Sequence, residues 1–319
     1  MDAPLSKKGH DKHLYIYSIS LSLLLLSFLL LHPYVQGLLV YLNVPYYLWI
    51  DYSSPNVPHW FNNGLSHPTT QYTISSTLTP HVQLGVWYTK SSTKSSAKRV
   101  VLYLHGNGES RADGWSLQKY SFFAAMPLEM DIVSFDYRGF GDSTGWPTEA
   151  GVYEDAYTVW KWMTSPQGLH LNTSQISIYG HSLGSSVAAQ LASRLSTQGT
   201  PPANLVLEAP FTNLVNVVTG YLPFPYVRDV LQNVLHHRFE TKEHLKKIKD
   251  DVPILLVHGK NDWVISYRNS EELLTDGGYQ RQLLLVEGAS HNDIIHSTVF
   301  KEKLIAFWGG LEVPPHFIS

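Results

Sequence analysis

Beyond residue 99 the chain alternates between short apolar runs and longer stretches in which apolar residues recur at helical spacing. The short runs are continuously apolar, which is typical of strands in a parallel sheet that is covered on both faces. Six such strands are predicted, at Val100–Leu104, Ile132–Phe135, Ile176–Tyr179, Leu205–Leu207, Ile254–Val257 and Gln282–Val286. Helices are predicted between them, for example at Glu149–Met163 and Ser185–Ser196. The alternation predicts an α/β fold whose mostly parallel central sheet carries helices on both faces.

The alternation is interrupted once, between residues 211 and 250, where helical spacing replaces any strand pattern. We predict that this stretch, about 211–250, is a helical cap insertion above the sheet. It contains a run rich in aromatic and apolar side chains, with Tyr221, Leu222, Phe224 and Tyr226. These four residues are candidates for an apolar lid over a substrate, and simple packing is the alternative.

The N-terminal part of the chain holds one longer apolar stretch. Residues 14–31 contain no charged side chain, and as a helix they would extend about 27 Å, close to the thickness of a membrane's hydrocarbon core. Three lysines precede this stretch, and the next Lys or Arg is Lys90. This charge bias predicts a transmembrane signal-anchor helix at 14–31 in a single-pass membrane protein. Residues 1–13 would then lie in the cytosol and the rest of the chain in a lumenal or extracellular space. The location we expect is the endoplasmic reticulum, with the hydrolase domain in its lumen.

A cleaved signal peptide is the alternative for the same stretch, although the apolar run of a signal peptide is usually shorter. Val35 and Gly37 offer a poor cleavage site for it. The tripeptide Asn172-Thr173-Ser174 is a glycosylation motif predicted on a surface loop. Glycosylation of Asn172 would suit a lumenal glycoprotein.

Residues 32–60 are interpreted as an interfacial segment or linker before a globular domain that spans 61–319. This segment contains amphipathic aromatic side chains of the kind that gather at a bilayer surface, namely Tyr41, Tyr46, Tyr47 and Trp49. The alternative is that these side chains pack on the globular domain.

The composition narrows the class of protein and its chemistry. Of the 319 residues, 44% are hydrophobic and 15% are charged, which excludes a disordered chain. The formal net charge is −3 and no basic stripe is present, so we predict no nucleic-acid partner. The chain has no cysteine, which excludes a thiolate nucleophile and cysteine zinc sites. Metal-binding and nucleotide-binding motifs are also absent from the sequence, so we predict no metal and no cofactor.

The most informative motif is the pentapeptide Gly180-His181-Ser182-Leu183-Gly184, which follows a predicted strand and opens a predicted helix. A sharp strand-to-helix turn of this kind exposes the serine hydroxyl as a nucleophile. The turn requires small residues two positions before and after the serine, and both positions, Gly180 and Gly184, are glycines. We therefore predict that Ser182 is a catalytic nucleophile on such an elbow.

A nucleophilic serine needs a base, and the base needs an acid that orients it. We predict His291, which follows the last strand, as the base and Asp262, which follows the preceding strand, as the acid. The resulting chain order of serine, aspartate and histidine is that of α/β-hydrolases. His296 is the nearest rival for the base. Asp136 and Asp142 are interpreted as turn-forming acids because they precede the nucleophile.

An acyl-transfer enzyme also needs donors for the oxyanion of its tetrahedral intermediate. The glycine-rich turn at residues 105–109 follows a predicted strand and can aim a main-chain N–H group at the site. We predict that the main-chain N–H groups of Asn107 and Leu183 form the oxyanion hole. The alternative for the turn is a tight loop without a catalytic role.

With these residues in place, the chain resembles the membrane-anchored α/β-hydrolase-domain lipases that act on monoacylglycerols and lysophosphatidylserine. The matching stretches within residues 60–310 are LYLHGNGESR, FDYRGFGDSTGWPTEAGVYEDA, YGHSLGSSVAAQLASRL, TPPANLVLEAPFTNL and PILLVHGKNDWVI. The resemblance implies an α/β-hydrolase fold for residues 61–319, with the serine, aspartate and histidine named above as its catalytic triad. The family often has two adjacent acids where this chain has Asn261-Asp262, so only the second acid is available here.

The resemblance also implies a lipid substrate, the membrane bilayer as a partner and a serine hydrolase mechanism. The enzyme would cleave long-chain fatty-acyl glycerol esters, either a monoacylglycerol or a lysophospholipid such as lysophosphatidylserine, through an acyl-enzyme. A protein depalmitoylase or acyl-thioesterase needs the same triad and is the main alternative, and a non-catalytic hydrolase-fold binding protein is a minor one. Four basic side chains are candidates for an anionic head group or for a solvated basic face, namely Arg228, His236, His237 and Arg238.

Overall fold

The computed structural model describes residues 20, 22, 32–42, 50–55, 65–91, 99–125, 127–221, 226–275 and 281–309. The predicted transmembrane helix at 14–31 lies almost wholly outside these residues, so it stays a prediction. None of the helices that the structure describes is both long and apolar enough to cross a membrane.

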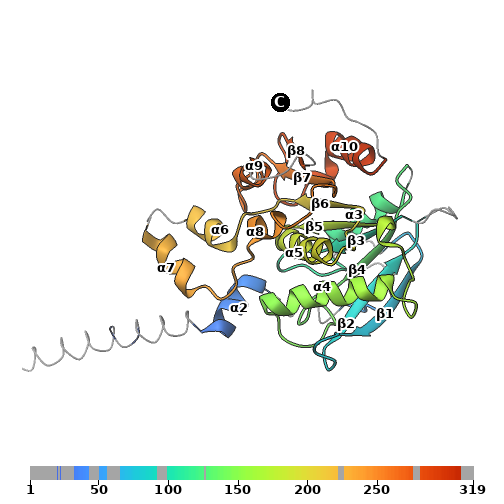
Figure 1. Cartoon of the computed structure of the whole chain (residues 1–319), viewed down its shortest axis with the longest axis horizontal. Helices are drawn as coiled ribbons and strands as arrows, with labels where there is room; N and C mark the ends of the chain where they lie inside the picture. Colours follow the sequence, from blue (N-terminus) through green and yellow to red (C-terminus); the bar gives the residue numbers. More distant parts are fainter. Residues whose placement is uncertain are drawn as a thin grey trace, which may run out of the picture.

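One eight-stranded sheet forms the centre of the described part of the chain (Figure 1). Its strands are β1 (Thr69–Ser75), β2 (Gln83–Thr89), β3 (Val100–Leu104), β4 (Asp131–Phe135), β5 (Ile176–His181), β6 (Asn204–Glu208), β7 (Ile254–Gly259) and β8 (Arg281–Val286). The order across the sheet is β1-β2-β4-β3-β5-β6-β7-β8. β3 to β8 run parallel, whereas β2 pairs antiparallel with both β1 and β4. The prediction of a mostly parallel sheet is confirmed, and the six predicted strands differ from β3–β8 only at their ends.

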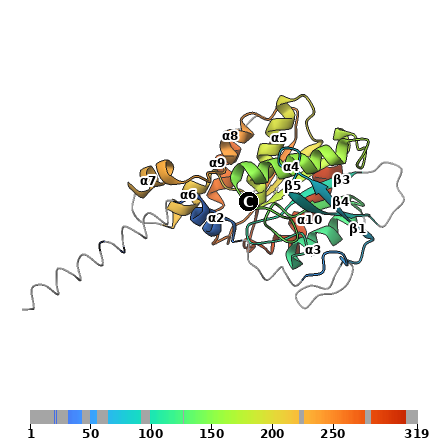
Figure 2. The ribbon, with the colours of Figure 1, turned by 90° about the horizontal axis from the view of Figure 1, so that it is seen from below.

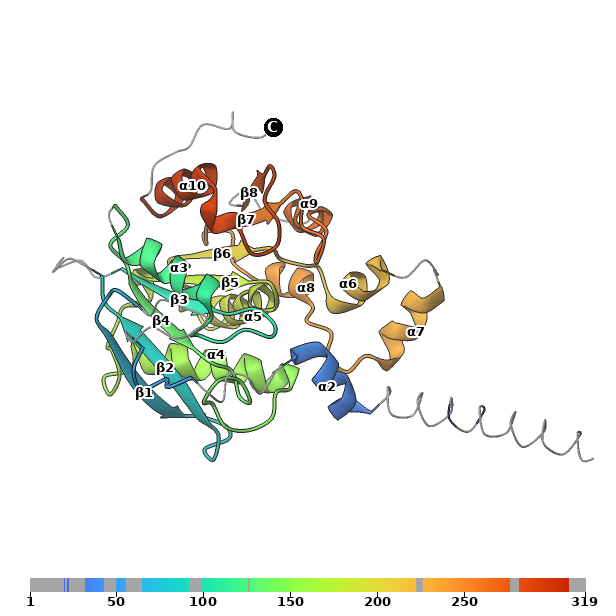
Figure 3. The same ribbon diagram turned by 180° about the vertical axis from the view of Figure 1, so that it is seen from behind.

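Helices cover both faces of this sheet, as predicted (Figures 1 and 3). The α-helices are α2 (Pro33–Tyr41), α3 (Gly114–Ala124), α4 (Glu149–Thr164), α5 (Leu183–Thr197), α6 (Leu214–Gly220), α7 (Tyr226–Val234), α8 (Thr241–Leu245), α9 (Arg268–Thr275) and α10 (Thr298–Gly309). Two short 3-10 helices, η2 (Thr173–Gln175) and η3 (Ile294–His296), lie in the connections. α4 and α5 pack on one face of the sheet, and α3 and α10 pack on the other.

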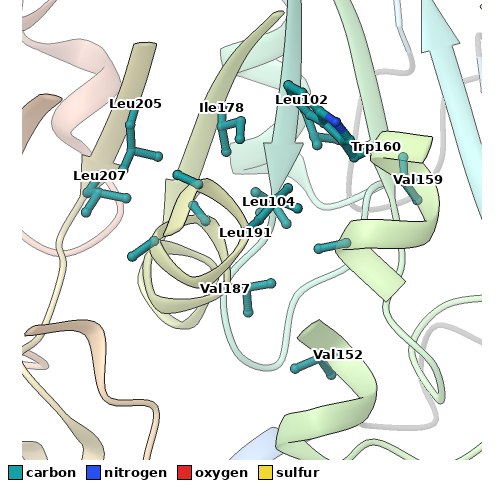
Figure 4. Close-up of a cluster of buried hydrophobic side chains, with 14 of the residues drawn as sticks. Leu102, Leu104, Val152, Val159, Trp160, Ile178, Val187, Leu191, Leu205 and Leu207 are labelled. Atoms are coloured by element: carbon teal, nitrogen blue, oxygen red, sulfur yellow. The ribbon is translucent and has the colours of Figure 1, made fainter. Parts of the chain in front are cut away.

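The central strands contribute to two hydrophobic cores because neighbouring side chains of a strand point to opposite faces. Val101 and Tyr103 of β3 join the core under α3 and α10, whereas Leu102 and Leu104 join the core under α4 and α5. Figure 4 shows the second core, where side chains of β3, β5 and β6 meet those of α4 and α5. Coverage of both faces explains why these strands are continuously apolar in the sequence.

The parallel register aligns the carboxyl ends of the central strands. Leu104 of β3 pairs with Gly180 of β5, and Gly180 pairs in turn with Leu207 of β6. β7 and β8 continue the sheet in the same direction. The turns after β3, β5, β7 and β8 therefore leave the sheet at one edge, and each carries a residue predicted for the site.

The predicted cap region 211–250 is helical in its described residues, where α6, α7 and α8 connect β6 to β7. Figures 1 and 2 place α6, α7 and α2 together at one end of the molecule. Gln36 of α2 joins the two segments, because its side-chain nitrogen donates to the carbonyl oxygen of Val234 at 2.8 Å. Its side-chain oxygen accepts the N–H of His236 at 2.9 Å. α2 and the insertion are thus bound to each other.

Within segment 32–60 the chain forms α2, whose last residue is packed on the domain. Tyr41 is fully buried, and its ring makes edge-on contacts with Phe140 and Phe239. Its hydroxyl lies 3.2 Å from Nδ1 of His237. The interpretation of Tyr41 as an interfacial aromatic is therefore wrong, because the side chain fills an apolar pocket of the domain. The other three aromatics in that interpretation lie outside the described residues.

Candidate active site

Ser182 occupies the sharp turn between β5 and α5. Its backbone has φ 53° and ψ −118°, a conformation that residues other than glycine rarely adopt. A Cβ on Gly184 would lie 2.6 Å from the main-chain oxygen of His105. A Cβ on Gly180 would lie 2.8 Å from the Cβ of Ala188. Only glycine at these two positions lets α5 begin directly against the strands, which is what places the serine at the edge of the sheet.

The three residues predicted as a triad come together from three different turns. Nε2 of His291 lies 3.0 Å from Oγ of Ser182, and Nδ1 of His291 lies 2.7 Å from Oδ2 of Asp262. The carboxylate of Asp262 can only accept a hydrogen bond, so the hydrogen of the neutral ring lies on Nδ1. Nε2 is then free to accept the serine proton. Each of the three residues is only 8% exposed, so most water is excluded from this row.

Asp262 is surrounded by donors that favour its ionised form. Its Oδ1 accepts the main-chain N–H groups of Val264 and Ile265, both at 2.8 Å. Burial alone would raise the pKa of this carboxyl, but hydrogen bonds from His258 and His291 hold the pKa well below its ordinary value. Asp262 therefore carries a full negative charge at neutral pH, which is what an imidazolium at His291 requires.

His258 is a neighbour of this row that no sequence motif indicates. It is fully buried at the end of β7, and its Nε2 lies 3.2 Å from Oδ2 of Asp262 and 2.9 Å from the carbonyl oxygen of Ile265. Both neighbours are acceptors, so Nε2 carries a hydrogen, and Nδ1 contacts the hydroxyl of Ser270 at 2.7 Å. The four-residue spacing between His258 and Asp262 is the only sequence signal, and it does not distinguish this role from that of a core histidine.

The turn after β3 lies against the start of α5. Asn107 and Leu183 stand three residues beyond Leu104 and Gly180, which pair in register. Within the part of the chain that the structure describes, neither of their main-chain N–H groups has a hydrogen-bond partner. Leu183 is the first residue of α5, so its N–H also carries the partial positive charge of a helix N-terminus. Two available N–H donors, one of them on the residue that follows Ser182, are of the kind that an oxyanion needs.

This turn is held in place from two sides. The N–H of Gly108 donates to the main-chain oxygen of Tyr41, the last residue of α2, at 3.1 Å. The N–H of Gly106 donates to Oε2 of Glu109 at 2.8 Å. The position of Asn107 between these two anchored residues therefore depends on both α2 and the Glu109 side chain.

His181, the second residue of the pentapeptide, connects three parts of the site. Its Nε2 lies 3.2 Å from the main-chain oxygen of His291, and its Nδ1 lies 3.1 Å from Oε1 of Glu109. Both partners are acceptors, so both ring nitrogens carry a hydrogen and the ring is an imidazolium. Since Glu109 also accepts the N–H of Gly106, the His181–Glu109 pair joins the serine elbow to the histidine turn and to the turn after β3.

Opposite charges balance behind the nucleophile. Burial and the charge of Lys119 both lower the pKa of His181. The carboxylates of Glu109 and Glu208 raise it and outweigh these two effects, so that the pKa of His181 lies above its ordinary value. Burial would raise the pKa of the two glutamates, but the nearby cations hold the pKa of each below its usual range. Lys119 and Glu208 form a fully buried ion pair at 2.6 Å.

The predicted lid lies only partly within the described residues. Leu222 and Phe224 are outside them. Tyr221 and Tyr226 are exposed, and the hydroxyl of Tyr221 donates to the carbonyl oxygen of Trp263 at 2.8 Å. The insertion therefore reaches the turn that carries the aspartate, while its closure over a substrate stays a prediction.

Two other predicted residues lie away from the serine. His296, the rival base, is exposed, and its ring lies 5.9 Å from the ring of Trp115. Asn172 is exposed at the start of η2, where its side chain accepts the N–H of Ser174 at 3.1 Å. Its place on the surface agrees with the predicted loop, and its glycosylation stays a prediction.

The four basic candidates for an anionic head group differ in burial. His237 is buried, and burial lowers its pKa, so it does not belong to a solvated basic face. The other three basic candidates, Arg228, His236 and Arg238, are exposed.

Asp136 and Asp142 both pair with the buried Arg111 rather than acting only in turns. Among the described residues, no group of three or more His, Cys, Asp or Glu side chains is arranged to hold a metal ion.

The chain is similar to known hydrolases. A sequence model of the alpha/beta hydrolase fold matches residues 99–246. Lysophosphatidylserine lipase ABHD12 of Danio rerio is 32% identical over 273 residues, which cover 76% of this chain and 66% of that protein. The lipase of the same name from Xenopus tropicalis is 31% identical over 283 residues, which cover 79% of this chain and 68% of that protein. The chain thus spans about two thirds of the length of these relatives.

Solved structures show the same architecture. An alpha-beta hydrolase from Vibrio vulnificus superposes with a TM-score of 0.62 at 20% identity, covering 86% of this chain and 91% of that chain. An esterase from Pyrococcus furiosus also gives a TM-score of 0.62, at 19% identity, and covers 80% of this chain and 95% of that chain. At these identities the likeness concerns the fold.

Proposed function

Because the chain belongs to the α/β-hydrolase family that includes the lysophosphatidylserine lipases ABHD12, we propose that it is a serine hydrolase of lipid esters with Ser182 as its nucleophile. The observation that carries the proposal is the row in which Asp262, His291 and Ser182 contact each other at 2.7 and 3.0 Å. A protein that only binds its ligand has no need for a buried acid, base and hydroxyl in this order.

In the proposed reaction, Oγ of Ser182 attacks the ester carbonyl carbon while its proton passes to Nε2 of His291. The main-chain N–H groups of Asn107 and Leu183 hold the oxyanion of the tetrahedral intermediate. The imidazolium, stabilised by Asp262, then protonates the departing alcohol and leaves an acyl-enzyme. A water molecule, activated by the same histidine, releases the fatty acid.

We propose long-chain acyl glycerol esters as substrates, either a monoacylglycerol or a lysophospholipid such as lysophosphatidylserine. The names of the similar lipases support this class. The proposed enzyme is anchored through residues 14–31 with its hydrolase domain in the lumen of the endoplasmic reticulum. A long acyl chain prefers the bilayer to water by about 0.8 kcal/mol per methylene group, so an anchored enzyme is held where such a substrate resides.

The test compares the full chain with Ser182→Ala on monoacylglycerols and lysophosphatidylserine, with acylated peptides and acyl-thioesters alongside. We expect Ser182→Ala to lower kcat by about 10⁶-fold and to abolish labelling by a fluorophosphonate. Ser193→Ala, a buried serine on α5 away from the turn, is the control and should keep both. Labelling that survives in Ser182→Ala would contradict the proposed nucleophile. Preference for the acylated peptides would favour a depalmitoylase instead.

A further inference from the structure

We propose that the catalytic domain docks on a lipid bilayer through one side of α2, using an apolar stripe formed by Tyr34, Leu38 and Leu42. The inference deepens the proposed function, on which it rests for the nature of the substrate. It assigns the contact with the bilayer to three residues that follow the predicted membrane span in the chain, rather than to that span alone.

α2 is apolar around most of its circumference, with Gln36 as its one strongly polar side chain. One side packs on the domain through Tyr41 and Gly37, where a Cβ on Gly37 would lie 3.6 Å from the indole nitrogen of Trp146. Of the stripe, Tyr34 and Leu38 lie on successive turns of the helix, and Leu42 follows directly after its last residue, in a left-handed backbone conformation. They are 61%, 51% and 51% exposed, in chain order. Contiguous exposed apolar side chains of this size mark an interaction surface.

The stripe is continued by exposed apolar side chains of neighbouring segments. The ring of Trp146 lies 6.0 Å from that of Tyr34. Tyr226 and Val230 are exposed on α7, which is bound to α2 through the hydrogen bond of Gln36 described above. Figures 1 and 2 show α2, α6 and α7 at the same end of the molecule. The surface is therefore wider than one helix.

Three features of the sequence and the structure favour a bilayer as the occupant. The predicted membrane span at 14–31 ends directly before α2 in the sequence, so a chain anchored there holds the stripe close to the membrane. α2 contains no charged residue that would resist burial among lipids. Tyrosine and tryptophan favour the headgroup level, and leucine favours the acyl boundary beneath it.

The same helix supports the turn that carries Asn107. Tyr41, which accepts the hydrogen bond from Gly108 at 3.1 Å, directly precedes Leu42 of the stripe. A Cβ on Gly108 would lie 3.7 Å from the Cβ of Leu42. Docking would thus bring the turn that carries the proposed oxyanion donor close to the lipid surface.

The lack of cysteine in the chain allows a single label to report on one position. Leu38→Cys and Val299→Cys are prepared in the full chain, labelled with the fluorophore NBD and reconstituted into phosphatidylcholine vesicles. Val299 is 44% exposed on α10, which Figures 1 and 3 place away from α2, so it is the matched control. We expect the label at position 38 to emit at shorter wavelength and to be quenched by doxyl-labelled lipid. The label at position 299 should show neither effect.

Equal emission and equal quenching at the two positions would overturn the docking proposal. A shift at position 38 that the lipid quencher leaves unchanged, and that disappears when the protein is diluted among more vesicles, would also overturn it. In that case a second copy of the chain, rather than the bilayer, would cover the stripe.

A kinetic experiment tests whether docking delivers substrate. Leu38→Ser and Val299→Ser are compared on a long-chain lysolipid in vesicles and on a water-soluble short-chain ester. We expect Leu38→Ser to raise KM for the vesicle substrate about fivefold, because buried apolar area is lost, while kinetics on the soluble ester stay unchanged. Val299→Ser should change neither. An equal loss on both substrates would contradict docking. A wild-type chain inactive on both esters would contradict the proposed function, and the fluorescence experiment would still decide the docking.

Discussion

The conformation of Ser182 is imposed by its surroundings rather than by a preference of serine. Its N–H donates to the main-chain oxygen of Glu208 at 2.9 Å, and its carbonyl oxygen accepts the hydroxyl of Ser185 at 2.6 Å. The two flanking glycines let the start of α5 approach the strands closely enough to make these bonds. The position of the hydroxyl is therefore fixed by main-chain packing, which tolerates very little added volume.

The first prediction concerns this packing. Gly184→Ala is expected to lower the free energy of unfolding by about 3 kcal/mol, because the new Cβ would overlap the main-chain oxygen of His105. Gly220→Ala is the matched control, since a Cβ there would meet no atom within 4 Å, and its effect should stay within about 0.5 kcal/mol. Denaturant titration of both variants measures the difference. Similar stabilities would contradict the close packing described for the elbow.

A second prediction concerns the aspartate. Asp262→Asn is expected to lower kcat on a soluble ester by about 10⁴-fold, because an amide no longer fixes the tautomer of His291 or stabilises its charged form. Asn261→Ala, which changes the exposed neighbouring side chain, should leave kcat within about twofold of the wild type. Steady-state kinetics of the two variants test this. A large loss in Asn261→Ala would mean that the acid role is shared between the two positions.

At the scale of elements, α2 is attached to the insertion through Tyr41, which contacts His237, and through Gln36. Gln36 is buried and makes hydrogen bonds on both sides of the end of α7. Gln36→Ala is expected to increase amide hydrogen exchange in residues 226–238 by about tenfold, while exchange in the central strands stays unchanged. Asn233→Ala, whose side chain bonds only within α7, is the control. If amide exchange in residues 226–238 is the same in both variants as in the wild type, other contacts hold the insertion.

The elements that could be predicted from sequence are those with a local signal. β3–β8 are covered on both faces, so their continuous apolar runs indicate them directly. β1 is an edge strand of mainly polar residues in which partly buried and exposed positions are mixed, so it lacks such a run. α2 is apolar on both sides and so shows no amphipathic pattern, and whether Tyr41 faces lipid or domain depends on contacts with the distant Phe239.

The same distinction holds for the site. Ser182, Asp262 and His291 each follow a strand, so their sequence context alone places them at one edge of a parallel sheet. His258 lies only four residues before Asp262, but that spacing alone does not distinguish it from a core histidine. His181 acts across turns that are far apart in the chain, since it and its partner Glu109 are separated by 72 residues. No local pattern contains that pairing, because it exists only once the sheet has brought β3 and β5 side by side.

At the scale of the whole molecule, stability should depend on pH through these buried charges. The pKa of His181 is raised in the fold, so its contribution to stability is complete below the unfolded value of about 6.5 and is lost as pH rises through the folded value. The pKa of Asp262 is lowered, so its contribution is present above about 3.9 and is lost as pH falls through the folded value. His181 therefore limits stability at high pH, and Asp262 limits it at low pH.

A final prediction follows for His181→Gln, which keeps polar atoms but removes the charge. The wild type should exceed this variant in thermal-unfolding midpoint most clearly at about pH 6, and the gap should narrow towards about pH 9. Glu243→Gln, which alters an exposed ion pair with Lys246, should show a small and nearly constant gap over the same range. A His181→Gln gap that widens with rising pH would contradict a charged imidazole in the folded protein.

The order of the strands in the chain also has a consequence during synthesis. β5 and its serine elbow lie near the middle of the sequence, whereas β8, which pairs only with β7, leads to His291 much later. Because a domain generally folds as a unit, a nascent chain that still lacks β8 also lacks the proposed base and the strand that places it. The proposed esterase activity therefore requires that the last strand has left the ribosome and joined the sheet.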